Sequence, residues 1–253
     1  NLCSEITLPT GIDKDGRDRT AVCCLSSLNL EKYDEWKDDP NMIADVMRFL
    51  DNVLSDFINK APDQFKDAKY SAERERSVGL GVMGFHSFLQ KKRIPLESVM
   101  AKSWNKKIFK QIDEQVNQAS KDLAEERGAC PDAAEYGYKE RFSNKTAIAP
   151  TASISIICGG ASPGVEPIAA NSYTHKTLSG SFNVRNRYLE EILESHGKND
   201  DETWSTITTN QGSVSHLNFL TDLEKDVFKT AFELNQKWIV ELSGDRTQYI
   251  SQA

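Results

Sequence analysis

Metal-binding motifs, a basic surface and membrane-spanning runs are all missing from this sequence. Its five cysteines form no Cys-x-x-Cys pair and its four histidines have no partners at ligand spacing, which argues against zinc and iron–sulfur sites. The formal net charge of -7 argues against a nucleic-acid or anionic-membrane surface, because such surfaces need a basic patch. No run approaches the roughly 18 apolar residues that span a bilayer, and no signal peptide is visible. We therefore expect a cytoplasmic protein with no bound metal, no nucleic acid and no membrane partner.

The composition is ordinary for a globular protein. The 253 residues can bury a sizeable core, and 38% of them are apolar and 27% charged. No internal repeat or low-complexity linker interrupts the chain, so residues 1–253 are expected to form a single domain. An odd number of cysteines in a chain of this kind indicates thiols, among which a disulfide is more often catalytic than structural.

Apolar residues at helical spacing predict four helices. The two long ones are expected over residues 41–61 and 98–127. Shorter helices are expected over residues 184–196 and 221–243, and the second of these begins with a capping box at Thr221.

Two short apolar segments, residues 20–25 and 146–150, are predicted to be strands. Alternation along the first strand puts Cys23 and Cys24 on opposite faces, so only one of them can face a given site. The other is expected to be a packed thiol. Strands that alternate with helices indicate an α/β fold with mostly parallel strands.

Three glycines at positions 79, 81 and 84 fit a phosphate-binding loop only loosely. Such a loop must follow a strand and open a helix, and the spacing here does not match that register well. Close packing of the backbone beside a strand is the interpretation we favour.

Three different reactive groups alternate in the first six residues, Asn1-Leu2-Cys3-Ser4-Glu5-Ile6. If this run is extended, the amide of Asn1, the thiol of Cys3 and the carboxylate of Glu5 point to one side and converge on one small volume. The alternative is that Cys3 is a small buried hydrophobe, as cysteines often are. The residues alone leave both interpretations open.

Small and hydroxylic residues follow the second predicted strand, in the run Pro150-Thr151-Ala152-Ser153-Ile154-Ser155. Such residues can begin a helix whose unpaired amides hold an anion. A plain helix N-cap is an equally good explanation of Thr and Ser at this place.

Taken together, the first six residues, the run 150–155 and Ala21-Val22-Cys23-Cys24-Leu25-Ser26 resemble the catalytic large subunit of ribonucleotide reductases, class I type. They occur in the order and approximate spacing of that family, and the resemblance covers essentially the whole chain. It implies part of a ten-stranded α/β barrel, namely the second half, with the catalytic finger loop at its N-terminus.

The resemblance also implies roles for individual residues. Cys3 would carry the thiyl radical that takes hydrogen from C3′ of a ribonucleotide, Glu5 would take the proton of the 3′-hydroxyl, and Asn1 would hold the sugar. Cys23 would be one of two thiols that supply two electrons and become a disulfide; in the family the other lies upstream of this segment. Thr151 to Ile154 (Thr151, Ala152, Ser153, Ile154) would bind the substrate diphosphate.

The implied activity is reduction of ribonucleoside diphosphates to 2′-deoxyribonucleoside diphosphates. No cofactor would be bound by this segment. A metal-containing small subunit would supply the radical, and thioredoxin or glutaredoxin would supply electrons.

The chain also departs from the family, because it lacks the first half of the barrel, the effector-binding region and the relay tyrosines. We therefore expect a fragment that needs the remaining large-subunit segments as partners and is inactive alone. Two alternatives remain: an adenosylcobalamin-dependent ribonucleotide reductase, and a non-catalytic assembly fragment of a split large subunit.

Overall fold

The computed structural model describes residues 5–178 and 180–252, and a short parallel sheet lies at its centre. Strand β3 (Leu25–Asn29) pairs in parallel with β4 (Gly79–Met83). Residues 146–147 bridge the other edge of β4, also in parallel, and residue 252 extends the same arrangement by one further parallel bridge. The predicted parallel α/β sheet is therefore confirmed, and the described residues do not close it into a barrel.

Two antiparallel hairpins, which the sequence pattern did not predict, flank this sheet. One joins β1 (Gly11–Ile12) to β2 (Asp18–Arg19), and the other joins β5 (Ser172–Thr177) to β6 (Gly180–Arg185). The helices, in chain order, are η1 (Leu30–Lys32), α1 (Tyr33–Trp36), α2 (Met42–Lys60), η2 (Asp63–Phe65), α3 (Lys66–Glu75), α4 (Phe85–Lys91), α5 (Val99–Arg127), α6 (Pro131–Glu135), α7 (Ile154–Ile157), α8 (Arg187–Ser195), α9 (Asp201–Thr209), α10 (Asp222–Val227) and α11 (Gln236–Thr247).

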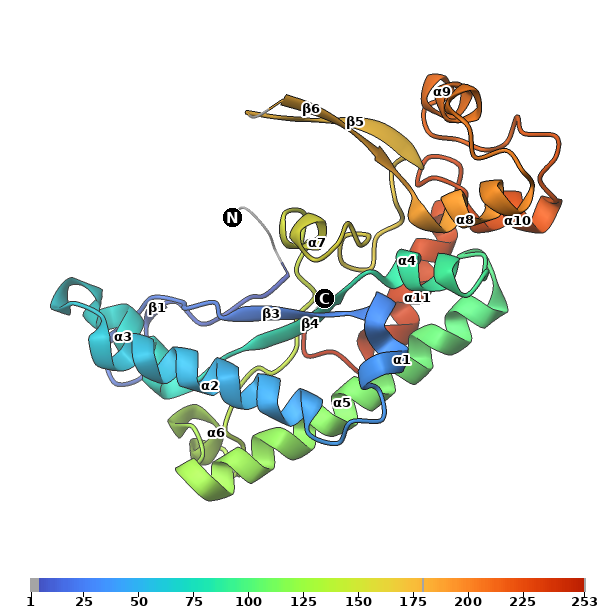
Figure 1. Cartoon of the computed structure of the whole chain (residues 1–253). Coiled ribbons are helices and arrows are strands. Elements are labelled where there is room, and N and C mark those ends of the chain that lie inside the picture. Colours follow the sequence, from blue (N-terminus) through green and yellow to red (C-terminus); the bar gives the residue numbers. More distant parts are fainter. Residues whose placement is uncertain (1–4, 179, 253) are drawn as a thin grey trace.

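Helices α2 and α5 lie on one side of the β3–β4 pair, and α7 and the β5–β6 hairpin lie on the other (Figure 1). Both long helices have nearly the predicted bounds, and the side chain of Ser98 caps α5 by accepting from the Ala101 amide. The apolar stripes of both helices pack against the strands in the main core, which includes Leu50, Leu80 and Ile112. Burial of apolar surface on one face therefore fixes the sheet against this helical layer.

A second, smaller core lies under α8, α9 and α10, where Leu189, Trp204 and Phe228 are almost fully buried. The predicted helix at 184–196 corresponds to α8, which begins after Asn186 caps it.

One long helix over residues 221–243 was a wrong prediction, because the chain forms α10 and α11 with a break between them. The capping box at Thr221 is present. Val227 packs into the second core and Leu234 into the main core, so the apolar stripe serves two different cores. The helix therefore has to end between Val227 and Leu234.

The predicted strand at residues 20–25 was also wrong, since β3 begins only at Leu25. Pairing starts where β4 begins opposite it, with the Gly79 amide donating to the Cys24 carbonyl at 2.9 Å. Cys23 and Cys24 therefore lie in extended chain ahead of the strand.

Close packing explains the glycines of β4. A Cβ atom on Gly81 would lie 2.3 Å from the carbonyl oxygen of Ala147, and one on Gly79 would lie 2.3 Å from Cδ2 of Leu25. Both distances are far inside van der Waals contact, so side chains here would push the neighbouring segments apart.

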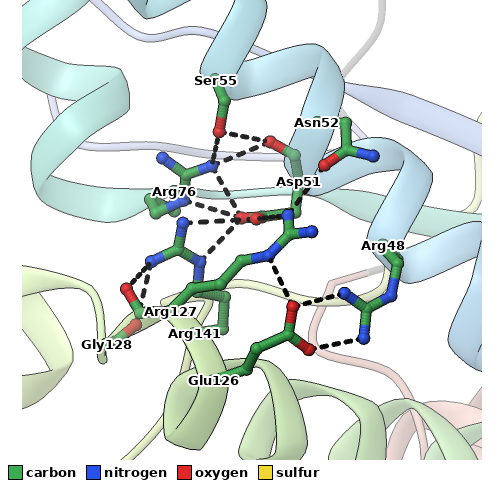
Figure 2. A network of polar contacts seen from close by, with 9 residues as sticks. All are labelled: Arg48, Asp51, Asn52, Ser55, Arg76, Glu126, Arg127, Gly128 and Arg141. Atoms are coloured by element: carbon green, nitrogen blue, oxygen red, sulfur yellow. Dashed lines mark hydrogen bonds and ion pairs between the residues drawn. The ribbon is translucent and has the colours of Figure 1, made fainter.

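A buried ionic cluster ties α2 to the ends of α3 and α5 (Figure 2). Asp51 on α2 is 0% exposed and accepts from Arg76, Arg127 and Arg141, each at 2.8 Å. Burial alone would raise the pKa of Asp51, but hydrogen bonds from Arg141 and the charge of Arg76 outweigh it and hold the pKa below its usual value. The cluster fixes the segment that leads into residues 146–150.

Candidate functional site

The two adjacent cysteines before β3 have different surroundings. Cys23 is exposed, whereas Cys24 is half-buried and packs against the main core. Burial raises the pKa of the Cys24 thiol, which makes the reactive thiolate scarcer. Cys23 is therefore the accessible thiol of the two, and its redox role stays a prediction.

Of the three groups at the start of the chain, Asn1 and Cys3 lie outside the described residues. Glu5 is partly buried, and no described residue donates a hydrogen bond to its buried Oε2. Two residues later, the backbone of Thr7 exchanges two hydrogen bonds with the side chain of Gln252. Thr7, two residues after Glu5, is thus anchored beside the outermost parallel bridge of the sheet.

The predicted diphosphate site is a turn that leads into α7. Ala152, Ser153 and Ile154 are exposed, and within residues 5–178 and 180–252 nothing accepts a hydrogen bond from their backbone N–H groups. Thr151 differs, because its side chain is buried and its Oγ1 accepts from the Gly164 amide at 2.8 Å. Its φ of 52° is in the left-handed region. Thr151 therefore fixes the shape of the turn, while the exposed residues 152–154 keep N–H groups that no described residue accepts.

The loop after α7 is held by the carboxyl ends of β3 and β4. The side-chain amide of Asn29 donates to the Cys158 carbonyl at 3.4 Å, and the Gly84 amide donates to the Ser162 carbonyl at 2.7 Å. Ser87 and Ser162 each accept the other's backbone N–H. The turn therefore lies at the carboxyl ends of parallel strands, where α/β sheets commonly bind ligands.

A buried carboxylate, Glu31 in η1 directly after β3, secures the same loop. Its oxygens accept from the Tyr188 hydroxyl at 2.8 Å and from Arg187 at 3.1 Å, and Arg187 also donates to the Gly159 carbonyl. Burial, together with the hydrogen bond to Glu31, raises the pKa of Tyr188 above its ordinary value. No local sequence pattern reveals this group, because its members are far apart in the chain and belong to no motif.

A cavity of about 700 Å³, with many charged residues in its lining, lies at the amino ends of the strands. Its floor includes the buried carboxyl of Glu75, whose pKa burial raises to about 7 despite a hydrogen bond from Ser77 and the charge of Arg19. Other charged residues of its wall pair with one another, for example Arg19 with Asp132 at 2.7 Å. Ion pairs between neighbouring side chains therefore balance much of the charge that lines this cavity.

The structure separates the two ends of the predicted site. Cys23 precedes the amino end of β3. Thr151 to Ile154 instead follow the segment at residues 146–147, which pairs with β4. The five residues of β3 span about 17 Å at about 3.3 Å per residue.

Among residues 5–178 and 180–252, no group of three or more His, Cys, Asp and Glu side chains is arranged to hold a metal ion. No described helix is long and apolar enough to cross a membrane.

Known proteins provide close comparisons. The sequence matches the family described as "Ribonucleotide reductase, barrel domain" over residues 1–141 and 132–253. Ribonucleoside-diphosphate reductase large subunits of Invertebrate iridescent virus 6 and Invertebrate iridescent virus 3 are 51% and 46% identical, over 99% and 100% of this chain and 26% and 40% of their own length. The Actinobacillus ureae class Id ribonucleotide reductase alpha subunit superposes with a TM-score of 0.88 at 40% identity, over 100% of this chain and 46% of that chain. The chain thus spans less than half the length of these relatives.

Proposed function

This chain belongs to the ribonucleotide reductase barrel-domain family, and we propose that it supplies the catalytic half-barrel of a large subunit that reduces ribonucleoside diphosphates. One observation carries the proposal: the whole chain shares its fold and 40% of its sequence with a class Id alpha subunit. The names of the viral relatives support diphosphates as the substrate class.

The proposed chemistry replaces the 2′-hydroxyl of the ribose by hydrogen. A thiyl radical on Cys3 takes the hydrogen atom from C3′ and later returns it, while Glu5 takes the proton of the 3′-hydroxyl and Asn1 holds the sugar. The 2′-hydroxyl takes a proton from one of two thiols and leaves as water, and the two thiols supply two electrons and the hydrogen that replaces it at C2′ as they form a disulfide. Cys23 is one of these thiols, and its exposure supports the assignment.

Glu5 is a suitable general base because its Oε2 is buried and has no donor among the described residues. An acceptor without a partner is available for a substrate hydroxyl within hydrogen-bond reach. The roles of Asn1 and Cys3 rest on the sequence likeness.

The N–H groups of the exposed residues Ala152, Ser153 and Ile154 are donors for the substrate diphosphate. Phosphate oxygens are strong acceptors, and backbone N–H groups in turns commonly hold them. Thr151 contributes by holding Gly164 and so fixing the turn.

Partners are required because the chain covers only part of its relatives. We propose that the remaining large-subunit segments complete the barrel and that a metal-containing small subunit supplies the radical. We also propose that thioredoxin or glutaredoxin reduces the disulfide after each turnover and that the reaction takes place in the cytoplasm.

Turnover measurements on variants test this proposal. This chain is combined with the remaining large-subunit segments and a small subunit, and formation of deoxyribonucleoside diphosphate is measured for wild type, Cys3→Ser, Cys23→Ser and the control Cys158→Ser. We expect activity only in the wild type and the control, since Cys158 is exposed but outside the proposed site. Activity of Cys3→Ser equal to wild type would identify a non-catalytic assembly fragment, and a requirement for adenosylcobalamin would identify the other radical source.

A further inference from the structure

We propose that Gln252 is a positioning residue for the catalytic segment at the start of the chain, acting through the backbone of Thr7. The inference deepens the proposed function and rests on it for its catalytic part. The contact itself is independent of that function, so the two can be tested separately.

The side chain of Gln252 binds Thr7 at two points. The Thr7 N–H donates to Oε1 of Gln252, and Nε2 of Gln252 donates to the Thr7 carbonyl at 2.8 Å. The second hydrogen of Nε2 is donated to Oδ1 of Asn144 at 3.0 Å. A primary amide has two donors and one acceptor oxygen, and all are used here. The side chain thus offers Thr7 the donor and acceptor that a neighbouring strand would offer.

Gln252 is itself fixed to the sheet. Its backbone N–H donates to the Thr146 carbonyl at 3.2 Å, and the preceding Ser251 N–H donates to Oγ1 of Thr146 at 2.7 Å. Asn144, the other partner of the Gln252 side chain, donates to the Val78 carbonyl at 2.9 Å. A continuous series of hydrogen bonds therefore connects the chain beside β4 to Thr7.

This connection ends two residues from Glu5, the proposed general base. Glu5 can serve only if its carboxylate lies about 2.6–3.2 Å from the hydroxyl whose proton it takes. A misplacement of about 1 Å can lower a rate about 100-fold. Because the hydrogen-bond partners of Gln252 are Thr7, Asn144 and Thr146, and Ala152 to Ile154 are not among them, loss of the Gln252 contact should lower kcat and leave KM for the diphosphate almost unchanged.

The first test measures the contact between Gln252 and Thr7 and does not depend on enzyme activity. Gln252→Met keeps the length of the side chain and removes its donors and acceptor. Its matched control is Gln248→Met, because Gln248 is exposed and its side chain, among the described residues, donates only to the Asp245 carbonyl. We expect hydrogen exchange of the Thr7 amide in the 253-residue chain to accelerate at least about tenfold in Gln252→Met, the result of losing roughly 1.4 kcal/mol of protection, and to stay unchanged in the control.

The second test measures kcat and KM in the assembly described above. Gln252→Met should lower kcat by about 10- to 100-fold with KM changed by less than about twofold, and Gln248→Met should match wild type. Circular dichroism and thermal unfolding verify that both variants are folded.

Each result decides the inference. Equal Thr7 exchange in Gln252→Met and wild type would overturn it, as would faster exchange with an unchanged kcat or with a change confined to KM. An inactive wild-type assembly would refute the proposed function and the catalytic part of the inference, while the exchange result would still decide whether Gln252 holds Thr7.

Discussion

Asp51 and Arg141 form a buried ion pair with two contacts, Nε to Oδ1 at 2.8 Å and Nη2 to Oδ2 at 3.2 Å. Arg76 and Arg127 bind the same carboxylate, so Asp51→Asn leaves three guanidiniums around an uncharged amide with one acceptor oxygen in place of two (Figure 2). We expect Asp51→Asn to lower the free energy of unfolding by about 3–5 kcal/mol, measured by urea titration.

Asp56→Asn is the matched control for this prediction. Asp56 lies on the same helix and is exposed, and within the described part of the chain its one ion pair is with Lys60 on the surface. Its replacement should cost less than about 1 kcal/mol. Because the pKa of Asp51 is lowered, its stabilisation is complete above the ordinary value of about 3.9 and is lost as pH falls through the folded value. The gap between wild type and Asp51→Asn should therefore shrink in acid; equal effects of both substitutions at neutral pH would contradict the account.

Glu75 should make stability depend on pH in the opposite direction. Burial raises its pKa to about 7, so between about pH 4.5 and 7 the unfolded chain ionises while the folded chain stays protonated. As pH rises through this range, the free energy of unfolding of wild type should fall. Glu75→Gln should therefore gain stability relative to wild type by up to roughly 3 kcal/mol. Urea titrations at pH 5 and 8 measure this.

The control for Glu75 is Glu73→Gln on the same helix, where the side chain is exposed. Its stability relative to wild type should not change between the two pH values. A pH-independent difference for Glu75→Gln would show that Glu75 is ionised throughout.

Close packing in β4 predicts opposite effects of two alanine substitutions. Gly81→Ala places a Cβ atom 2.3 Å from the Ala147 carbonyl oxygen and should lower the free energy of unfolding by at least about 2 kcal/mol. Gly244 lies within α11 with no neighbouring atom within 4 Å of such a Cβ, so Gly244→Ala should be neutral or stabilising by up to about 1 kcal/mol. Thermal unfolding of both variants is the measurement, and a tolerated Gly81→Ala would refute the packing argument.

The thiols should react with iodoacetamide in order of their exposure. Cys23 and Cys158 are exposed, Cys24 is half-buried and Cys130 is 0% exposed; burial raises the pKa of the latter two thiols. We expect Cys23 to be alkylated at least about tenfold faster than Cys24, with Cys130 unreactive in the folded chain. Mass spectrometry of peptides measures the rates, and faster reaction of Cys24 would reverse the assignment of the accessible thiol.

Much of the fold was predictable because local patterns and long-range packing agree. The spacing of apolar residues predicted α2 and α5, since each buries one continuous stripe in one core. The same reasoning failed at residues 221–243, because Val227 and Leu234 continue one stripe but belong to two cores. Only the three-dimensional arrangement shows that the chain must change direction there.

The site residues that belong to sequence motifs were predictable, whereas those held together by long-range contacts were not. The sequence pointed to Cys23 and to the turn at residues 151–154, but gave no sign that Thr151 is buried against Gly164. The contact of Gln252 with Thr7 joins residues 245 positions apart, and no local pattern encodes it. Likewise, a lone aspartate on the apolar face of α2 does not reveal three distant arginines.

A single turnover without external reductant tests the central claim most directly. The reduced assembly is mixed with a ribonucleoside diphosphate, quenched, and analysed for deoxyribonucleotide and for the oxidation state of every cysteine by mass spectrometry. The account predicts one disulfide at Cys23 for each deoxyribonucleotide formed, with Cys24 still a thiol. Product formed while Cys23 remains reduced, or a disulfide at Cys24 instead, would contradict it.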